Sequence, residues 1–408
     1  MKRIRNLLLL GALLAWGNCS LQADDPPKAV RAVVAPNAAG IYWHAFAAFP
    51  SLADEEKKLL KAATPTDTAP LPEQLVPIVA RYGRAIHELH RARAVAPCDW
   101  QLDMAAGPVL ILPHVDKALE LSRVVLLRAR QRFAAGEIDA ALTDVLAAFK
   151  LARDCGASPI VVSLYVDSAI EKSASDVLAA NLTRLKKEQI NPVLAAIREL
   201  PPTSDLASTI IEEEHSLCGW LEREINAVAA KLNDPQAGGQ VVIAVTSSLL
   251  DRGGPGPSNE EAAEDKRKTE LLKTLSVADV RESLQRLRSD YDELHRIAGL
   301  PFAARAEHIK FFADSMSKAS RMQTRDDAMR YLSVVLMPFD WSESFMREEQ
   351  LHVRRQLLKQ AILIQLDVED AVREIHGRKV DYRKTGTGFE LSCLVGNKAE
   401  TLTVGSSE

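Results

Sequence analysis

The sequence predicts an all-α protein, an irregular array of helical hairpins that ends in a small β-hairpin. Apolar residues recur at helical spacing through most of the chain. Composition points the same way, because aromatic residues make up only 5% of the chain whereas Ala, Leu, Arg and Glu are abundant. The pattern changes to strand-like alternation only after Gly377, so β structure is expected at the C-terminal end alone.

The first 23 residues predict a secretory signal peptide. A basic start is followed by an apolar core from Leu7 to Trp16 and then by small and polar residues. This core is shorter than the roughly 20 apolar residues of a membrane-spanning helix. No later segment reaches that length without charges. We therefore expect an exported protein, periplasmic or secreted, without a transmembrane segment in the mature chain. Cys19 offers an alternative, lipid attachment as in bacterial lipoproteins.

The helices after the signal peptide are separated by proline, glycine and capping residues. A proline-rich loop spans 65–72, and Pro201 to Asp205 ends one helix and caps the next. Beyond Gly377, residues 380–385 and 389–395 alternate around a glycine turn, and 401–404 suits a third short strand. Helices are predicted at 38–49, 52–63, 72–95, 114–134, 137–154, 159–182, 186–199, 204–232, 276–298, 302–319, 325–336 and 342–376.

Length and composition predict the domain organisation. A chain of 408 residues exceeds the size at which one core stops growing. Residues 251–270 are rich in Gly and Pro and then in charges, which is typical of a flexible linker. We expect a helical-hairpin domain at 24–250 and a C-terminal helical domain at 271–408 that ends in the β-hairpin. The formal net charge of −4 argues against a nucleic-acid partner.

The clearest local pattern surrounds residues 136–151. Gly136 precedes a helix in which Ala141 and Ala148 are small enough for a neighbouring helix to approach closely. The spacing resembles the second helix of a tetratricopeptide repeat. Arg128 and Arg132 stand where the first helix of such a repeat has apolar residues. The pattern does not recur at a period of 34, so an irregular array is expected rather than a regular solenoid.

Motifs spread along the chain resemble a family of exported proteins of planctomycetes and related bacteria. They are Ile41-Tyr-Trp43, Cys98-Asp-Trp-Gln-Leu-Asp103, Gly107-Pro108, Leu112-Pro-His114, Ala169-Ile-Glu171, Glu214 with Gly219-Trp-Leu221, and the terminal 381–391. The chain lacks the proline-rich segment that usually precedes the terminal strand pair. The resemblance implies export and a helical fold, and it implies no catalytic residue.

The loop from Cys98 to His114 holds the most suggestive side chains. Trp100 suits a binding platform, and Asp103 or His114 could exchange protons with a ligand. The structural alternative is that Trp100 fills the core, that an aspartate caps a helix, and that His114 begins one. Glu214 completes the candidate binding residues. No catalytic residue is predicted, because the chain lacks a Gly-x-Ser-x-Gly elbow, a Walker loop and a dinucleotide fingerprint.

Two Glu-x-x-His pairs raise the possibility of a metal-carboxylate bundle. They are Glu212 with His215 and Glu349 with His352, each pair one helical turn apart. Chance explains two such pairs among this many glutamates and histidines, and solvated helix faces are the simpler interpretation. His87 and His90, set among arginines, are interpreted as another solvated face. No metal site and no cofactor is therefore expected.

Four cysteines remain after the signal peptide, and their pairing stays open. Export would place them in an oxidising compartment, where three pairings are possible. Buried free thiols are the alternative. The cysteines are Cys98, Cys155, Cys218 and Cys393.

The leading functional prediction is non-catalytic. Stacked helical hairpins form grooves that bind proteins or peptides, so we expect a cell-envelope binding scaffold whose partner is an envelope protein or peptide. The alternative is a secreted enzyme with a pocket around Asp99, Asp103 and His114.

Overall fold

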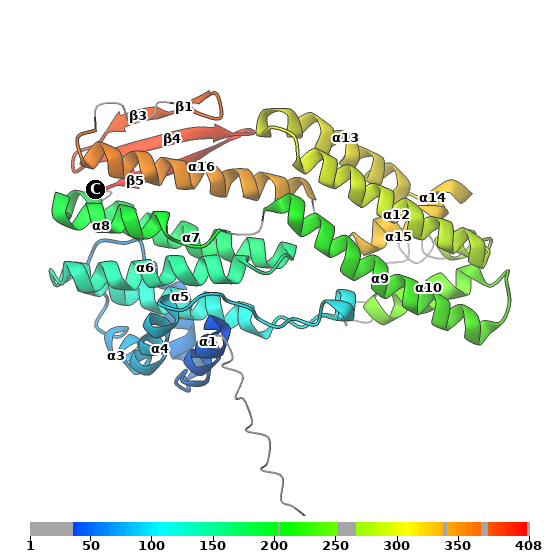
Figure 1. Ribbon diagram of the computed structural model, residues 1–408, viewed down its shortest axis with the longest axis horizontal. Coiled ribbons are helices and arrows are strands. Elements are labelled where there is room, and N and C mark those ends of the chain that lie inside the picture. Colours follow the sequence, from blue (N-terminus) through cyan, green and yellow to red (C-terminus); the bar gives the residue numbers. More distant parts are fainter. Residues whose placement is uncertain (1–35, 203–204, 251–266, 338–340, 369–373, 406–408) are drawn as a thin grey trace, which may run out of the picture. The chain divides into compact units, whose positions relative to one another are not determined.

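The computed structural model describes residues 36–202, 205–250, 267–337, 341–368 and 374–405. The predicted signal peptide at 1–23, with Cys19, lies outside these residues, and so does most of the predicted linker at 251–270. Figure 1 shows helices throughout the described chain and a small sheet near its C-terminal end. The predicted all-α fold with a small C-terminal β-hairpin is confirmed.

The first half of the chain forms short helices followed by longer ones. Pro113 stands at the first turn of α5, where its missing N–H costs nothing. Gly136 adopts a left-handed φ of 78° and turns the chain from α5 into α6. The elements are α1 (Ala38–Ala47), α2 (Asp54–Ala62), α3 (Val76–Arg81), α4 (Gly83–Arg93), η1 (Met104–Val109), α5 (Pro113–Ala134), α6 (Ile138–Gly156), α7 (Val161–Asn181), η2 (Leu182–Arg184) and α8 (Lys187–Arg198).

The second half adds a long helical group and the sheet. Asp205 caps α9 by accepting a hydrogen bond from the Ser208 N–H. The elements are α9 (Leu206–Leu232), α10 (Gly238–Leu250), α12 (Val277–Ala298), α13 (Phe302–Ser320), α14 (Arg325–Met329), α15 (Tyr331–Leu336), α16 (Trp341–Gln365), β1 (Glu374–Ile375), β2 (Arg378–Lys379), β3 (Asp381–Lys384), β4 (Phe389–Val395) and β5 (Lys398–Val404).

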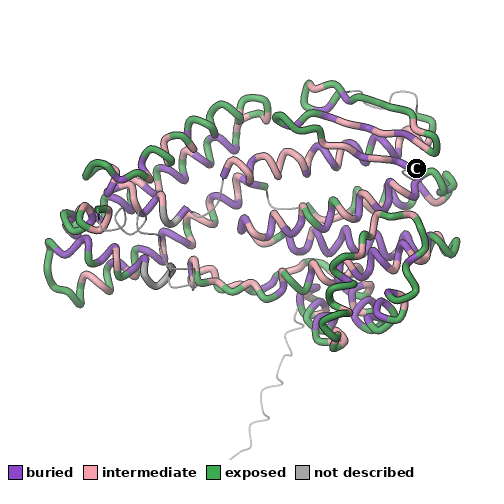
Figure 2. The backbone as a smooth tube through the Cα atoms, turned by 180° about the vertical axis from the view of Figure 1, so that it is seen from behind, coloured by how far each residue is buried: buried purple, intermediate pink, exposed green. Residues whose placement is uncertain are grey.

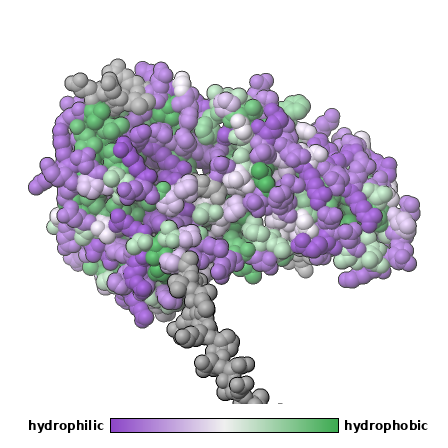
Figure 3. Space-filling view, viewed as in Figure 1, coloured by the Kyte–Doolittle hydropathy of each residue, from purple (hydrophilic) through white to green (hydrophobic). Residues whose placement is uncertain are grey.

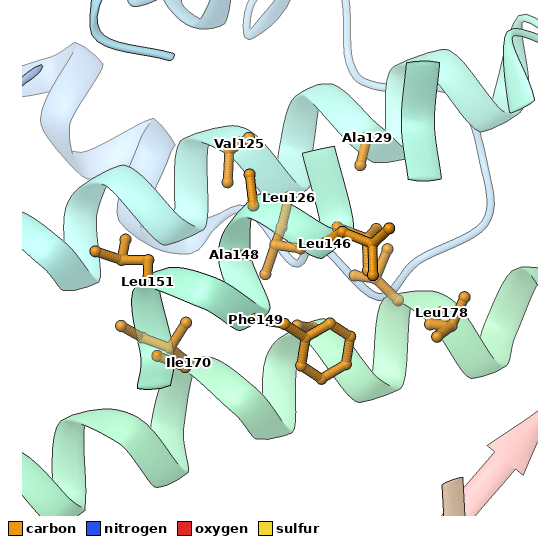
Figure 4. Close-up of a cluster of buried hydrophobic side chains, with 14 of the residues drawn as sticks. Val125, Leu126, Ala129, Leu146, Ala148, Phe149, Leu151, Ile170 and Leu178 are labelled. Carbon is orange, nitrogen blue, oxygen red and sulfur yellow. The ribbon is translucent and has the colours of Figure 1, made fainter. Parts of the chain in front are cut away.

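Helices α5, α6, α7 and α16 pack in succession, each against the next (Figure 1). Ala141 and Ala148 of α6 are fully buried, as the close approach of neighbouring helices requires. Figure 4 shows Phe149 of α6 lying toward α7, where Ile170 and Leu178 are also buried. Buried residues follow the inner faces of these helices (Figure 2). The α5–α6 hairpin is thus present, and its likeness to a tetratricopeptide repeat stays a prediction.

Two hydrophobic cores share two helices. The first core combines buried residues of 38–155 and 166–194 with the second half of α16 and the sheet, and the second core combines α9 to α15 with the first residues of α7 and α16. Val161 and Leu164 of α7 belong to the second core, whereas Ile170 belongs to the first. The packing therefore groups α9 and α10 with later helices, and the predicted domain boundary at 251–270 stays a prediction.

The C-terminal sheet is an antiparallel meander, β3–β4–β5. Lys384 pairs with Phe389 at the first turn, and Val395 pairs with Lys398 at the second. Alternate residues of β4 are buried, namely Phe389, Leu391, Cys393 and Val395. This period of two directs one face onto α16, which contacts both β4 and β5. The third strand extends further than residues 401–404.

Several predicted bounds were wrong. Helix α10 was not predicted, because Asp234 to Gly239 suggested an interruption only. The predicted helix at 72–95 is two helices that meet at Tyr82, and the one at 325–336 divides at Arg330. Helix α16 ends at Gln365 rather than at 376, and Asp367 has a left-handed φ of 57°.

None of the helices described combines the length and apolarity that crossing a bilayer requires. The face in Figure 3 is mostly hydrophilic, with small separate hydrophobic areas.

Candidate functional site: a basic pocket on a buried ion cluster

A buried ion cluster joins α4, α5 and α6. Its centre is Asp144 of α6, which is 0% exposed. Arg128 donates from Nε to Oδ2 at 2.9 Å and from Nη2 to Oδ1 at 2.6 Å, and Arg132 donates from Nη1 to Oδ2 at 2.9 Å. The Nε2 atom of His90 lies 2.8 Å from Oδ1. We call Asp144, Arg128, Arg132 and His90 the Asp144 cluster.

The Asp144 cluster explains two features of the sequence. Arg128 and Arg132 lie one turn apart on α5 and therefore share the helix face that meets α6. They depart from the tetratricopeptide pattern because they neutralise Asp144. His87 is exposed as predicted, but the prediction of a solvated face was wrong for His90, which turns toward α6.

The electrostatics of the cluster keep Asp144 charged. Burial by itself would raise the pKa of Asp144, but the hydrogen bonds from His90 and Arg128 and the two arginine charges lower that pKa below its ordinary value. A carboxylate with two guanidinium partners fixes the relative positions of α5 and α6. Helix α4 is fixed to the same point through His90.

A second buried pair follows two to three turns later on α6. Lys150 is 6% exposed, and its Nζ lies 2.5 Å from Oδ1 of Asp154. Tyr42 of α1 donates its hydroxyl to Oδ2 of Asp154 at 2.6 Å. Burial raises the pKa of Asp154. The charge of Lys150 and the hydrogen bonds from Lys150 and Tyr42 act in the opposite direction and lower it, but burial has the larger effect. Because these partners restrain it, Lys150 occupies a fixed position on α6.

A pocket of about 410 Å³ opens between α4, α6 and the end of α8. We call it the basic pocket. His90, Arg93 and Lys150 are the basic residues in its lining, and Glu199 is the acidic one. Apolar groups complete the wall, and these are Ala94, Leu146, Ala196, Leu200 and Pro201. Such a mixture of an apolar wall with a few fixed polar groups is typical of binding sites.

Arg93 distinguishes the basic pocket from the ion pairs around it. Within the described part of the chain Arg93 makes no ion pair, whereas Lys150 is held by Asp154 and His90 by Asp144. A partly exposed guanidinium beside apolar residues is able to bind a carboxylate in a bidentate manner. The pocket therefore suits a ligand that carries an acidic group next to an aliphatic one.

The sequence-predicted loop contributes to the core instead. Trp100 is buried, its ring stacks on His114 with centroids 4.3 Å apart, and its Nε1 donates to the Asp154 carbonyl at 2.8 Å. Tyr42 and Phe46 also stack on Trp100. The structural alternative, in which Trp100 fills the core, describes its position. Trp100 and His114 line none of the five cavities described for this chain.

The two aspartates of that loop are exposed and serve local turns. Asp99 accepts a hydrogen bond from the Gln101 N–H at 2.9 Å, and Asp103 caps η1 by accepting from the Ala105 N–H at 3.2 Å. His114 is buried, and burial lowers its pKa to about 4. The structure therefore brings His114 together with Trp100 and leaves both aspartates at the surface.

The remaining candidates lie elsewhere. Glu214 is half-buried on α9, whose neighbouring Leu217 and Cys218 belong to the second core. Glu212 and His215 are both exposed. Glu349 pairs with Arg378, and His352 lies beside His376 with ring centroids 4.6 Å apart.

Neither metals nor disulfides are indicated within the described residues. No three His, Cys, Asp or Glu side chains in the described ranges gather as a metal site requires. Cys98, Cys155, Cys218 and Cys393 are all free thiols in this structure. Burial raises the pKa of Cys155 and of Cys98, so both thiols are protonated at neutral pH.

Sequence reasoning missed Arg93, Lys150 and Glu199 as pocket residues. Each comes from a different helix or turn, and helical periodicity does not tell which helices meet. A signal was present in Arg128 and Arg132, because arginines at expected core positions indicate a buried acidic partner. In comparisons with known proteins, no family model, no curated protein and no solved structure matches this chain.

Proposed function

We propose that this chain is a non-catalytic helical binding protein of the cell envelope that holds a protein or peptide partner by an acidic group in the basic pocket. The observation that carries the proposal is Arg93, a cation without an ion-pair partner in the described chain, in the wall of the basic pocket of about 410 Å³. Export rests on the predicted signal peptide at 1–23.

Preorganisation supports binding at this place. The Asp144 cluster fixes α4 and α6, which carry Arg93 and Lys150 into the pocket. Lys150 is itself held by Asp154. A ligand therefore meets helices, and a Lys150 side chain, whose ordering cost belongs to folding rather than to binding.

The chemistry of the wall indicates the kind of partner. A carboxylate of the partner would pair with Arg93, and an adjacent aliphatic side chain would contact Leu146 and Leu200. Glu199, an exposed residue of the lining, disfavours a partner with several acidic groups, because like charges repel. The described lining residues include no hydroxyl or thiol nucleophile, which favours binding over covalent catalysis.

A peptide array tests the proposed function. The labelled mature protein is incubated with immobilised short peptides of random sequence. We expect selection of peptides that carry Asp or Glu beside Leu, Ile or Val. Arg93→Glu should shift the selection to Lys or Arg. Arg91→Glu is the matched control, because Arg91 lies on the same helix, is exposed, and pairs with Glu88.

Two outcomes of the array contradict the proposal. The first is that the folded protein selects no peptide. The second is that Arg93→Glu and Arg91→Glu change the selection alike, which would place binding outside the basic pocket. Export is tested separately by sequencing the N-terminus of the protein from a cell-envelope fraction. An intact N-terminus in the cytoplasm would contradict it.

A further inference from the structure

A second cavity lies in the other core, between α13, α15 and the start of α16. Its volume is about 260 Å³. The apolar part of its lining consists of Ile309, Phe312, Ala313, Met316, Val334, Met337 and Trp341. None of the described residues that line it is charged. We call it the Ser333 cavity, after the one fully buried polar residue in its wall.

Ser333 is the unusual member of this wall. It is 0% exposed, and its Oγ has no hydrogen-bond partner within the described chain. A buried hydroxyl without a hydrogen-bond partner destabilises the folded protein. The serines nearer the surface differ, because Ser317 is exposed and Ser320 donates to the Ser317 carbonyl at 2.7 Å.

We propose that the Ser333 cavity binds a small, neutral, mostly apolar molecule through one oxygen that hydrogen-bonds to Ser333. Phe312, Met316 and Trp341 offer aromatic and thioether surface to an apolar body. The absence of charge among the described lining residues disfavours an ionised ligand, whose burial without a counter-charge is costly. An engineered apolar cavity of about 150 Å³ holds benzene, so this larger cavity accommodates a monocyclic alcohol or ketone.

Three probe molecules of equal size separate what a hydrogen-bonding oxygen, an apolar body and a charge each contribute to the affinity. Benzyl alcohol carries the oxygen, ethylbenzene lacks it, and benzylammonium carries a charge. Isothermal titration calorimetry on the full mature chain gives each affinity. We expect benzyl alcohol to bind about fivefold more tightly than ethylbenzene, which corresponds to one net hydrogen bond. Benzylammonium should bind at least about tenfold more weakly than benzyl alcohol.

Two serine variants locate the bond. Ser333→Ala should lower the affinity for benzyl alcohol about fivefold and change the affinity for ethylbenzene by less than about twofold. Ser175→Ala is the matched control, because Ser175 is also a buried serine without a partner in the described chain but does not line the cavity. It should leave both affinities unchanged.

Ala313→Leu provides an independent variant, since it reduces the volume of the cavity and leaves residue 333 a serine. It should abolish binding of both neutral probes while circular dichroism shows an intact fold. The proposal is overturned if the folded wild-type protein binds neither neutral probe. It is equally overturned if Ser333→Ala and Ser175→Ala change the affinity for benzyl alcohol to the same extent.

Discussion

Two buried ionisable side chains of the first core have opposite surroundings. Asp144 has three partners, which lower its pKa. His114 stacks on Trp100, and both of its ring nitrogens lack a hydrogen-bond partner within the described residues. Burial alone determines its state, and its pKa falls to about 4. Asp144 therefore stabilises the fold through its charge, whereas His114 does so as an aromatic ring.

His114→Phe should make the protein less sensitive to acid. Since the folded pKa of about 4 lies below the ordinary 6.5, the unfolded chain binds more protons between these values. Stability of the wild-type protein therefore falls as pH falls from about 6.5 to 4. Phe keeps an aromatic ring and does not bind a proton, so it removes this loss of stability. The free energy of unfolding of the variant minus that of the wild type should therefore be higher at pH 4.5 than at pH 7.5, by on the order of 2 kcal/mol.

Guanidinium chloride unfolding at the two pH values measures this gain. His87→Phe is the control. Because His87 is exposed, its substitution should change the difference in free energy of unfolding between the two pH values little. An equal effect of the two substitutions would show that His114 does not titrate as a buried neutral group.

Asp144→Asn should lower the free energy of unfolding by about 3 kcal/mol at pH 7. The substitution keeps the shape of the side chain but leaves Arg128 and Arg132 without their counter-charge. Because the folded pKa of Asp144 is lowered, the wild-type stabilisation is present above the ordinary pKa and is lost as pH falls below it. The difference between variant and wild type should therefore shrink in acid.

Chemical denaturation across this pH range measures the difference. Asp54→Asn removes a carboxylate whose side chain is 87% exposed and should cost less than about 0.5 kcal/mol. If Asp144→Asn behaved like Asp54→Asn, the Asp144 cluster would not stabilise the fold.

At the scale of elements, η1 joins the two cores. The Ser216 hydroxyl of α9 donates to the Met104 carbonyl at 2.6 Å, and Arg223 donates to the Ala105 carbonyl at 2.5 Å. Gly107 of η1 has a φ of 60°, and a Cβ built on it would lie 2.6 Å from Trp220 Cβ. A glycine is therefore required there both by the backbone conformation and by the approach of α9.

Gly107→Ala should destabilise the protein more than Gly136→Ala. Both glycines have positive φ, so each substitution costs about 1 kcal/mol in backbone strain. Only Gly107 is crowded, and the clash with Trp220 should add about 1–3 kcal/mol. Thermal unfolding of the two variants measures the difference. Equal losses would mean that η1 and α9 do not pack closely.

At the scale of the whole molecule, periodicity predicted where most helices lie. The apolar stripe around Ala141 and Ala148 is buried as expected, and the alternation of 389–395 is a strand with one buried face. These features are local, since a helix or strand shows its period in its own residues. Helix α10 was missed because the residues before it, Asp234 to Gly239, suggested only a break.

Contacts between distant segments were not predictable from one sequence. His90, Arg128 and Asp144 come from three helices, and polar side chains of these types suit a solvated surface equally well. The Cys98–His114 loop drew attention because it combines Trp with ionisable groups, but the same composition suits a core aromatic stack beside surface turns. Periodicity also gave no sign that α16 enters both cores, through Phe345 and Leu357.

A charge-reversal cycle tests the basic pocket most directly. A peptide selected for its acidic residue is paired with an analogue that carries Lys at that position, and both are titrated into the wild type and into Arg93→Glu. We predict that the wild type prefers the acidic peptide at least about tenfold and that Arg93→Glu reverses the preference. Arg91→Glu should retain the wild-type preference. An unchanged preference in Arg93→Glu would contradict binding through this pocket.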